Sequence, residues 1–206
     1  SSESVIYCDM DGVLVDFETG TVELLNSILD GDDVKWVTRD GKSIQKALRR
    51  LHRELGTEWR AVGRTDLDIK PVRNFMFAVV KDSPGIFYGS LPQLKDGVSQ
   101  LWPYINASGH QVRLLTAGVK GRPEQLTSEQ GKTMWAMENL KPPPAEVIMM
   151  PASQKSEYAS NDGIANILID DKPSTIRSWN EMGGIGILHT PGGSSSTIKE
   201  LRSLGI

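Results

Sequence analysis

Two carboxylates stand two positions apart near the start of the chain, directly after a short apolar run. Residues 5–8 favour a β-strand, and Asp9 and Asp11 follow in the sequence CDMDG. Residues two apart on an extended backbone point to the same side, so these carboxylates can converge on one centre. Such a pair can bind a hard cation, supply a nucleophile with an acid/base partner, or do both. An acidic surface turn is the alternative interpretation of so short a motif.

Two later apolar runs also end in polar side chains. Residues 166–170 lead to Asp170 and Asp171, and residues 111–116 end in Thr116. The carboxyl ends of parallel strands lie at one rim of a sheet, so these groups are expected to form a single site with Asp9 and Asp11.

The combination of groups indicates magnesium and a phosphoryl group. Neighbouring carboxylates repel one another and take up protons unless a cation is present. The sequence has no histidine or cysteine cluster, which favours magnesium over zinc. A hydroxyl from Thr116 and an ammonium from Lys155 would then face the metal and hold the oxygens of a phosphoryl group.

The elements that must position these residues alternate between strands and helices. We expect strands at 111–116, 146–150, 166–170 and 185–189, and helices at 95–105, 128–140, 173–182 and 195–204. This alternation predicts an α/β fold, a three-layer sandwich around a mostly parallel sheet. Residues 1–16 and 91–206 form the expected core domain.

Residues 17–90 interrupt the alternation and predict a small helical cap domain inserted after the first strand. Helices are expected at 17–29, around 44–55 and at 72–80, followed by an irregular stretch. Residues 35–64 carry nine basic residues against three acidic ones, which indicates either a solvated face or guidance of an anionic substrate. Trp36 and Trp59 flank the basic helix, where they would pack the cap or stack on a base.

Composition narrows the class of protein. The chain has 206 residues, a net charge of -3 and one cysteine, Cys8. No apolar run is long enough to cross a bilayer, and the first residues do not resemble a signal peptide. A single thiol cannot form an internal disulfide, so we expect a cytoplasmic protein without a membrane partner.

The order of these motifs resembles the haloacid dehalogenase (HAD) superfamily of phosphotransferases. The resemblance lies in DMDGV, a strand ending in Thr116, then Lys155, then IDD, with an insertion after the first motif. It implies a Rossmann-like core in which Asp9 attacks phosphorus to form an aspartyl-phosphate and Asp11 acts as acid and base. It also implies phosphate contacts from Thr116 and Lys155, and a Mg²⁺ site at Asp9, the Asp11 carbonyl, Asp170 and Asp171.

A narrower resemblance concerns the substrate. The segments CDMDGVLVDFE, SLPQLKDGV, GKTMW and LIDDKP are similar to the 5'(3')-deoxyribonucleotidases, which remove phosphate from nucleoside monophosphates beneath a small helical cap. This similarity implies phosphate contacts from Lys132 and the Ala117 backbone, a base pocket at Phe17 and a basic contact at Lys120. Ala117 departs from that family, which usually has a hydroxyl residue there, and the middle of the cap does not align.

We therefore expect a Mg²⁺-dependent phosphoric monoester hydrolase of the 5'-nucleotidase type. Its substrate would be a nucleoside monophosphate, with deoxyribonucleotides favoured. Another small phosphate ester or a nucleic-acid terminal phosphate is the alternative substrate, although nucleic acid is not the expected partner. A phosphoacceptor signalling domain and an inactive binding module are the alternatives outside enzymes. A homodimer and a monomer both stay open.

Overall fold

The computed structural model describes residues 3–32, 34, 40–121 and 125–206. These residues form two compact units. The first, here called the sheet unit, comprises Ser1–Asp16, Pro92–Gly118 and Lys132–Ile206. The second, the helical unit, comprises Phe17–Leu91 and Val119–Gly131. In the described part of the chain, no helix combines the length and apolar character needed to cross a membrane.

The sheet unit contains a five-stranded parallel sheet with the order β3-β2-β1-β6-β7. Its strands are β1 (Ile6–Cys8), β2 (Val112–Thr116), β3 (Val147–Met149), β6 (Ile167–Asp170) and β7 (Ile185–Leu188). Every residue of β1 and β6 is buried, as expected for central strands with both faces covered. The predicted α/β fold with a mostly parallel sheet is therefore confirmed.

Register explains how the sheet can build a site at one rim. Cys8 of β1 pairs with Leu114 of β2 on one side and Ile169 of β6 on the other. The Asp9 N–H donates to the Ile169 carbonyl at 2.9 Å, which continues the pairing past the end of β1. Asp9 and Asp170 consequently leave the sheet at the same level.

Helices cover the sheet on both faces. They are α5 (Trp102–Asn106), preceded by a π-turn at Gly97–Leu101, together with α6 (Ser128–Asn139), α7 (Pro173–Glu181) and α8 (Ser194–Ser203). Against α7, the rings of Tyr7 and Trp179 meet edge to face within a buried cluster that includes Leu168. Trp135 of α6 is buried as a core residue.

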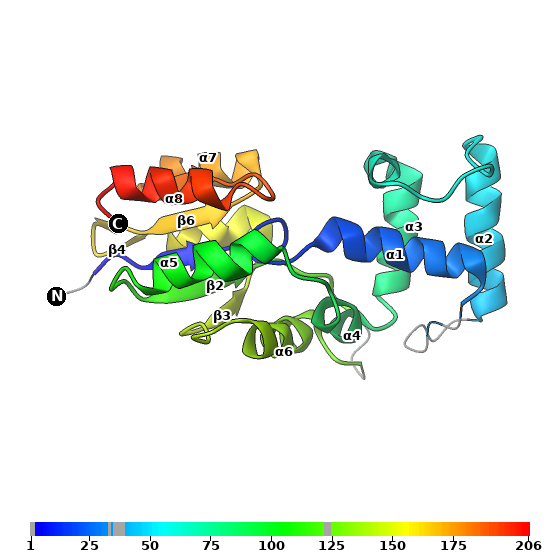
Figure 1. Ribbon diagram of the computed structural model, residues 1–206, viewed down its shortest axis with the longest axis horizontal. Helices are drawn as coiled ribbons and strands as arrows, with labels where there is room; N and C mark the ends of the chain where they lie inside the picture. The colour runs from blue at the N-terminus through cyan, green and yellow to red at the C-terminus, as the bar shows by residue number, and fades with distance from the viewer. Residues whose placement is uncertain (1–2, 33, 35–39, 122–124) are drawn as a thin grey trace. The chain divides into compact units, whose positions relative to one another are not determined.

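The helical unit contains α1 (Phe17–Asp30), α2 (Gly41–Glu54), α3 (Lys70–Val80) and α4 (Pro84–Gly89), with a 3₁₀ turn at Arg64–Asp68 (Figure 1). Ile44 and Leu48 are buried while the basic side chains of α2 face outward, which confirms the predicted amphipathic helix. Trp36, like Lys35 and Arg39 of the basic stretch, lies outside the described residues.

Two elements differ from the sequence prediction. The stretch after α3 was expected to be irregular, yet α4 forms there, with Pro84 in its first turn, where a missing N–H costs nothing. A short antiparallel pair, β4 (Ser160–Asn161) and β5 (Ile164–Ala165), was also missed. Its turn contains Asp162 and Gly163, both with positive φ, and an Asp-Gly dipeptide is the sequence signal for such a hairpin.

Candidate active site

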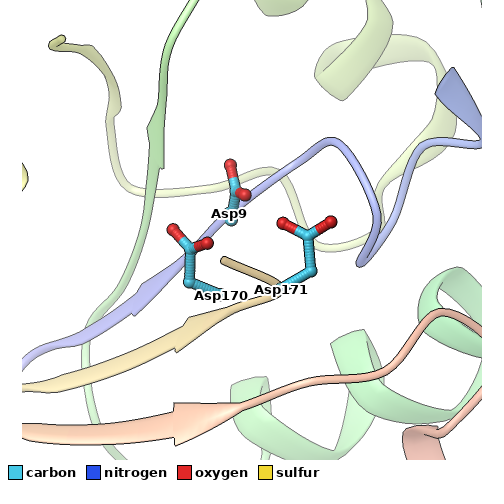
Figure 2. Close-up of side chains that lie close together, drawn as sticks. All are labelled: Asp9, Asp170 and Asp171. Carbon is cyan, nitrogen blue, oxygen red and sulfur yellow. The ribbon is translucent and has the colours of Figure 1, made fainter. Parts of the chain in front are cut away.

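Three carboxylates converge where β1 and β6 end. Asp9 follows β1, Asp170 closes β6 and Asp171 comes next in the chain; one oxygen from each lies within 4.8 Å of the others. Figure 2 shows the three side chains rising from the two neighbouring strand ends toward a common space. Asp9 and Asp170 are almost completely buried, so this cluster is not an acidic surface turn.

Lys155 supplies a positive charge to this cluster. It belongs to a short 3₁₀ helix at Ala152–Tyr158, and its side chain is buried rather than solvated. Its Nζ lies 2.8 Å from Asp170 Oδ2 and 3.3 Å from Asp9 Oδ1. Burial alone would lower the pKa of Lys155, but the charges of Asp9 and Asp170 outweigh it and raise that pKa. The ammonium therefore stays charged and bridges the two strand ends.

Lys132 forms a second bridge, between Asp11 and Thr116. Its buried Nζ donates to Thr116 Oγ1 at 2.6 Å and to Asp11 Oδ2 at 3.0 Å. Lys132 lies on α6, and Thr116 is the last residue of β2. The structure thus brings together the candidate acid/base residue and two of the candidate phosphate ligands.

Backbone groups complete the geometry of the site. The Met10 N–H donates to Asp9 Oδ1 at 2.8 Å, and the Lys172 N–H donates to Asp170 Oδ1 at 2.9 Å. Gly12 has a φ of +80°, and a Cβ at this position would collide with the Asp171 carboxylate. The glycine therefore lets the loop approach Asp171 closely.

The carboxylates of the cluster lie close together in a largely buried space. Burial raises the pKa of Asp9 and Asp11, and burial together with the charges of Asp9, Asp170 and Asp11 raises the pKa of Asp171 to about 8. With all four carboxylates ionised, including Asp170, the ammonium groups of Lys132 and Lys155 would leave two negative charges among the described residues of the site. A divalent cation would balance them.

The donor set suits magnesium. Asp9, Asp170 and Asp171 offer carboxylate oxygens alone, the ligands that this hard cation prefers, and two of the three are buried at fixed strand ends. These three residues would hold the ion. The carbonyl contribution from Asp11 implied by the resemblance stays a prediction.

Three other predicted site residues contribute less to this cluster. Ala117 follows Thr116 and is half-buried, but it has no side-chain donor for a phosphate. Phe17 and Lys120 belong to the helical unit, where Phe17 packs against aromatic rings and Lys120 is exposed. Their roles at the substrate stay predictions.

His189 lies beside the site, although no motif in the sequence assigns it a role. It follows β7, and its backbone N–H donates to the Asp170 carbonyl at 2.9 Å. Its buried ring bonds to Thr197 Oγ1 at 2.7 Å, and burial lowers its pKa. Its position directly after an apolar strand is the signal that could have identified it.

A scan against protein-family models and a search of curated proteins gave no match to this sequence. Solved structures do match the whole chain at low sequence identity. A Clostridium difficile protein assigned as a phosphatase has a TM-score of 0.52 at 11% identity, with 100% of each chain covered.

Dehalogenases are also among the matching structures. An L-2-haloacid dehalogenase has a TM-score of 0.50 at 12% identity, with 92% of this chain and 86% of that chain covered. A dehalogenase solved with an intermediate complex has a TM-score of 0.50 at 12% identity, with 99% and 97% covered. The chain therefore has a fold that occurs in HAD-type hydrolases.

Proposed function

We propose that this protein is a Mg²⁺-dependent phosphatase of the HAD superfamily that hydrolyses nucleoside monophosphates through an aspartyl-phosphate. The observation that carries the proposal is the convergence of Asp9, Asp170 and Asp171 within 4.8 Å. Two buried lysines stand beside this convergence, one bridging Asp9 and Asp170 and the other bridging Asp11 and Thr116.

The residues present can perform two successive displacements at phosphorus. In the first, a carboxylate oxygen of Asp9 bonds to phosphorus, the ester P–O bond breaks, and Asp11 gives its proton to the leaving oxygen. In the second, Asp11 takes a proton from water as the water oxygen attacks phosphorus, which releases inorganic phosphate and restores Asp9.

The lysines and the cation would supply the positive charge that the phosphoryl oxygens require. Lys132, Lys155 and the Thr116 hydroxyl would hold phosphoryl oxygens. When bound by Asp9, Asp170 and Asp171, Mg²⁺ supplies positive charge that offsets the charge of the phosphoryl oxygens and of the carboxylates.

Asp11 favours phosphate-ester hydrolysis over displacement of a halide. A halide leaves carbon as a stable anion and needs no proton, whereas the alkoxide of a phosphate ester does. Asp11 Oδ1 is buried and has no hydrogen-bond partner among the described residues, so this oxygen is not committed to a structural contact.

The nucleotide assignment rests on a group of aromatic rings in the helical unit. Phe17, Phe77, Phe87 and Tyr88 form a cluster of rings in the helical unit, with Phe17 and Phe77 stacked at a centroid distance of 6.3 Å and both only half-buried. Half-buried rings can stack on a base. Lys120 would add a basic contact. Another small phosphate ester or a nucleic-acid terminus is the alternative substrate.

Phosphate release across a panel of nucleoside monophosphates and sugar phosphates, with Mg²⁺ or with EDTA, tests the proposal. We expect Mg²⁺-dependent release from at least one deoxyribonucleotide and none from the Asp9→Asn variant. Release from sugar phosphates alone would replace the nucleotide by the alternative substrate. A folded protein that is inert toward the whole panel would overturn the phosphatase assignment.

A further inference from the structure

Residues 94–97, here called the supporting segment, pack against residues 10–16, here called the catalytic loop. The Leu94 N–H donates to the Leu14 carbonyl at 2.8 Å. At Gly97, an added Cβ would collide with a backbone carbonyl of the loop, so a residue with a side chain does not fit there without displacing the loop. The two segments therefore meet backbone to backbone, in a contact that the proposed chemistry does not itself use.

The catalytic loop is held tightly together. The Met10 carbonyl accepts hydrogen bonds, at 2.9 to 3.2 Å, from the N–H groups of Val13, Leu14 and Val15. Val13 and Leu14 are also completely buried. Asp11 lies inside this hydrogen-bonded turn, and a closely packed interior transmits small displacements. The position of the supporting segment therefore helps to set the position of the Asp11 carboxylate.

Asp96 fastens the supporting segment to α8. Its Oδ2 accepts hydrogen bonds from the Ser194 N–H at 3.1 Å and from the Ser194 hydroxyl at 2.5 Å. Ser194 is the first residue of α8 and is completely buried. The first N–H groups of a helix have no acceptor within the helix, and this end carries a partial positive charge, so the Asp96 carboxylate both caps and stabilises α8.

The same face of α8 also reaches the strand end that bears Asp170. Thr197 lies three residues after Ser194, which places both side chains on one face of the helix, and both are buried. The Thr197 Oγ1 bonds to the ring of His189 at 2.7 Å, and the His189 N–H donates to the Asp170 carbonyl at 2.9 Å. α8 therefore connects the end of β6 with the segment that supports the catalytic loop.

We propose that Asp96 is a positioning residue that acts through the supporting segment and holds Asp11 within reach of the leaving oxygen. Without the bonds to Ser194, the catalytic loop can shift relative to Asp9, and a displacement of about 1 Å is enough to slow a reaction markedly. The inference rests on the proposed phosphatase function, because the acid role of Asp11 is part of that function.

Two leaving groups separate positioning of the acid from a general loss of folded protein. Benzyl phosphate and 4-nitrophenyl phosphate both carry an aromatic ring, but only the benzyl alkoxide needs a proton to leave. Asp96→Ala should lower kcat/KM for benzyl phosphate at least about tenfold more than for 4-nitrophenyl phosphate. Asp96→Asn keeps an oxygen that can accept from Ser194, so it should recover most of this difference. An equal loss for the two substrates would overturn the proposal.

Hydrogen exchange followed by mass spectrometry tests the same link without any activity. Asp96→Ala should speed exchange of the peptide that covers the catalytic loop at least about tenfold and leave the β2 peptide within about twofold. Tyr104→Phe is the matched control, because it removes a hydrogen bond from α5 to the Ile206 carbonyl just beyond the other end of α8.

Unchanged exchange of the catalytic loop in Asp96→Ala, or an equal change in Tyr104→Phe, would overturn the link between Asp96 and the loop. Faster exchange in Asp96→Ala combined with a wild-type protein that hydrolyses no phosphate ester would support that link and overturn the proposed phosphatase function instead.

Discussion

The ammonium nitrogen of Lys155 lies 2.8 Å from Asp170 Oδ2, and both side chains are almost completely buried. Lys155 comes from a short 3₁₀ helix and Asp170 from the end of a central strand, so the pair joins two separate elements at the site. A buried charge that loses its partner lowers the stability of the folded protein. The Lys155–Asp170 pair is therefore expected to stabilise the fold as well as to serve the chemistry.

Replacing Lys155 by Met should destabilise the protein in EDTA by about 3–5 kcal/mol, because Asp9 and Asp170 lose their buried cation. Mg²⁺ should restore part of this loss. Urea unfolding with and without Mg²⁺ measures both effects. Lys172→Met is the matched control, since Lys172 is exposed and uses only its backbone N–H at the site. Equal stability of the two variants would contradict the bridging role of Lys155.

Mg²⁺ should raise the melting temperature of the wild-type protein, because a ligand that binds only the folded state stabilises it. At a Mg²⁺ concentration about 100-fold above the dissociation constant, the gain is about 2.7 kcal/mol. Asp170→Asn should abolish most of the shift, since this variant removes one of the three carboxylates. Asp68→Asn, at an exposed side chain outside the cluster, should retain the shift. An undiminished shift in Asp170→Asn would place the metal elsewhere.

Gly12→Ala should abolish activity and destabilise the protein, because the new methyl group collides with the Asp171 carboxylate. Gly109→Ala is the matched control: Gly109 also has a positive φ, of +85°, but a Cβ there meets no atom within 4 Å. In both variants, placing alanine at a positive φ lowers the stability by about 1 kcal/mol. Only Gly12→Ala also displaces a site residue. Activity assays combined with urea unfolding separate the two effects. Retained activity in Gly12→Ala would contradict the close approach to Asp171.

The sequence predicted the rim of the sheet well, because each strand is a short apolar run that ends in a recognisable polar residue. Asp9, Thr116 and Asp170 fall at such ends; parallel register brings Asp9 and Asp170 to one level, with Thr116 one residue further along β2. Sequence could not show that Lys155 is buried, since burial depends on packing of the 3₁₀ helix against the rest of the unit. Of the two roles expected for Trp59, packing the cap and stacking on a base, its 79% exposed side chain contradicts the first. The sequence could not decide between them, because the ring is held at the surface by a hydrogen bond to the Gly56 carbonyl and by the Arg60 guanidinium.

Acid should weaken the helical unit through the ion pair of Asp66 with Arg60. Hydrogen bonds from Arg60, and a backbone hydrogen bond from Gly63, lower the pKa of Asp66 from 3.8 to about 2. Because the folded pKa lies below the unfolded value, this stabilisation is complete above pH 3.8 and is lost as the pH falls through 2. It amounts to about 2 kcal/mol at neutral pH.

Asp66→Asn should therefore be less stable than the wild-type protein at pH 6, and the difference should shrink steadily between pH 4 and pH 2. Urea unfolding across this range measures it, with Asp68→Asn as a control whose exposed side chain lies near Arg73. If the difference in free energy of unfolding between the two proteins does not change with pH, the stabilisation by Asp66 comes from its hydrogen bonds and not from its charge.

Because Asp9 is the proposed nucleophile, chemical trapping of the phosphoryl group on this residue is the decisive experiment. Acid quench of the wild-type protein during turnover of a nucleoside monophosphate with a radiolabelled phosphate, in Mg²⁺, should give label on the peptide containing Asp9, sensitive to hydroxylamine and absent from Asp9→Asn. Asp11→Asn should slow both formation and loss of the label, because the first displacement then lacks its acid and the second its base. Label on another residue, or phosphate release by Asp9→Asn at the wild-type rate, would contradict the account.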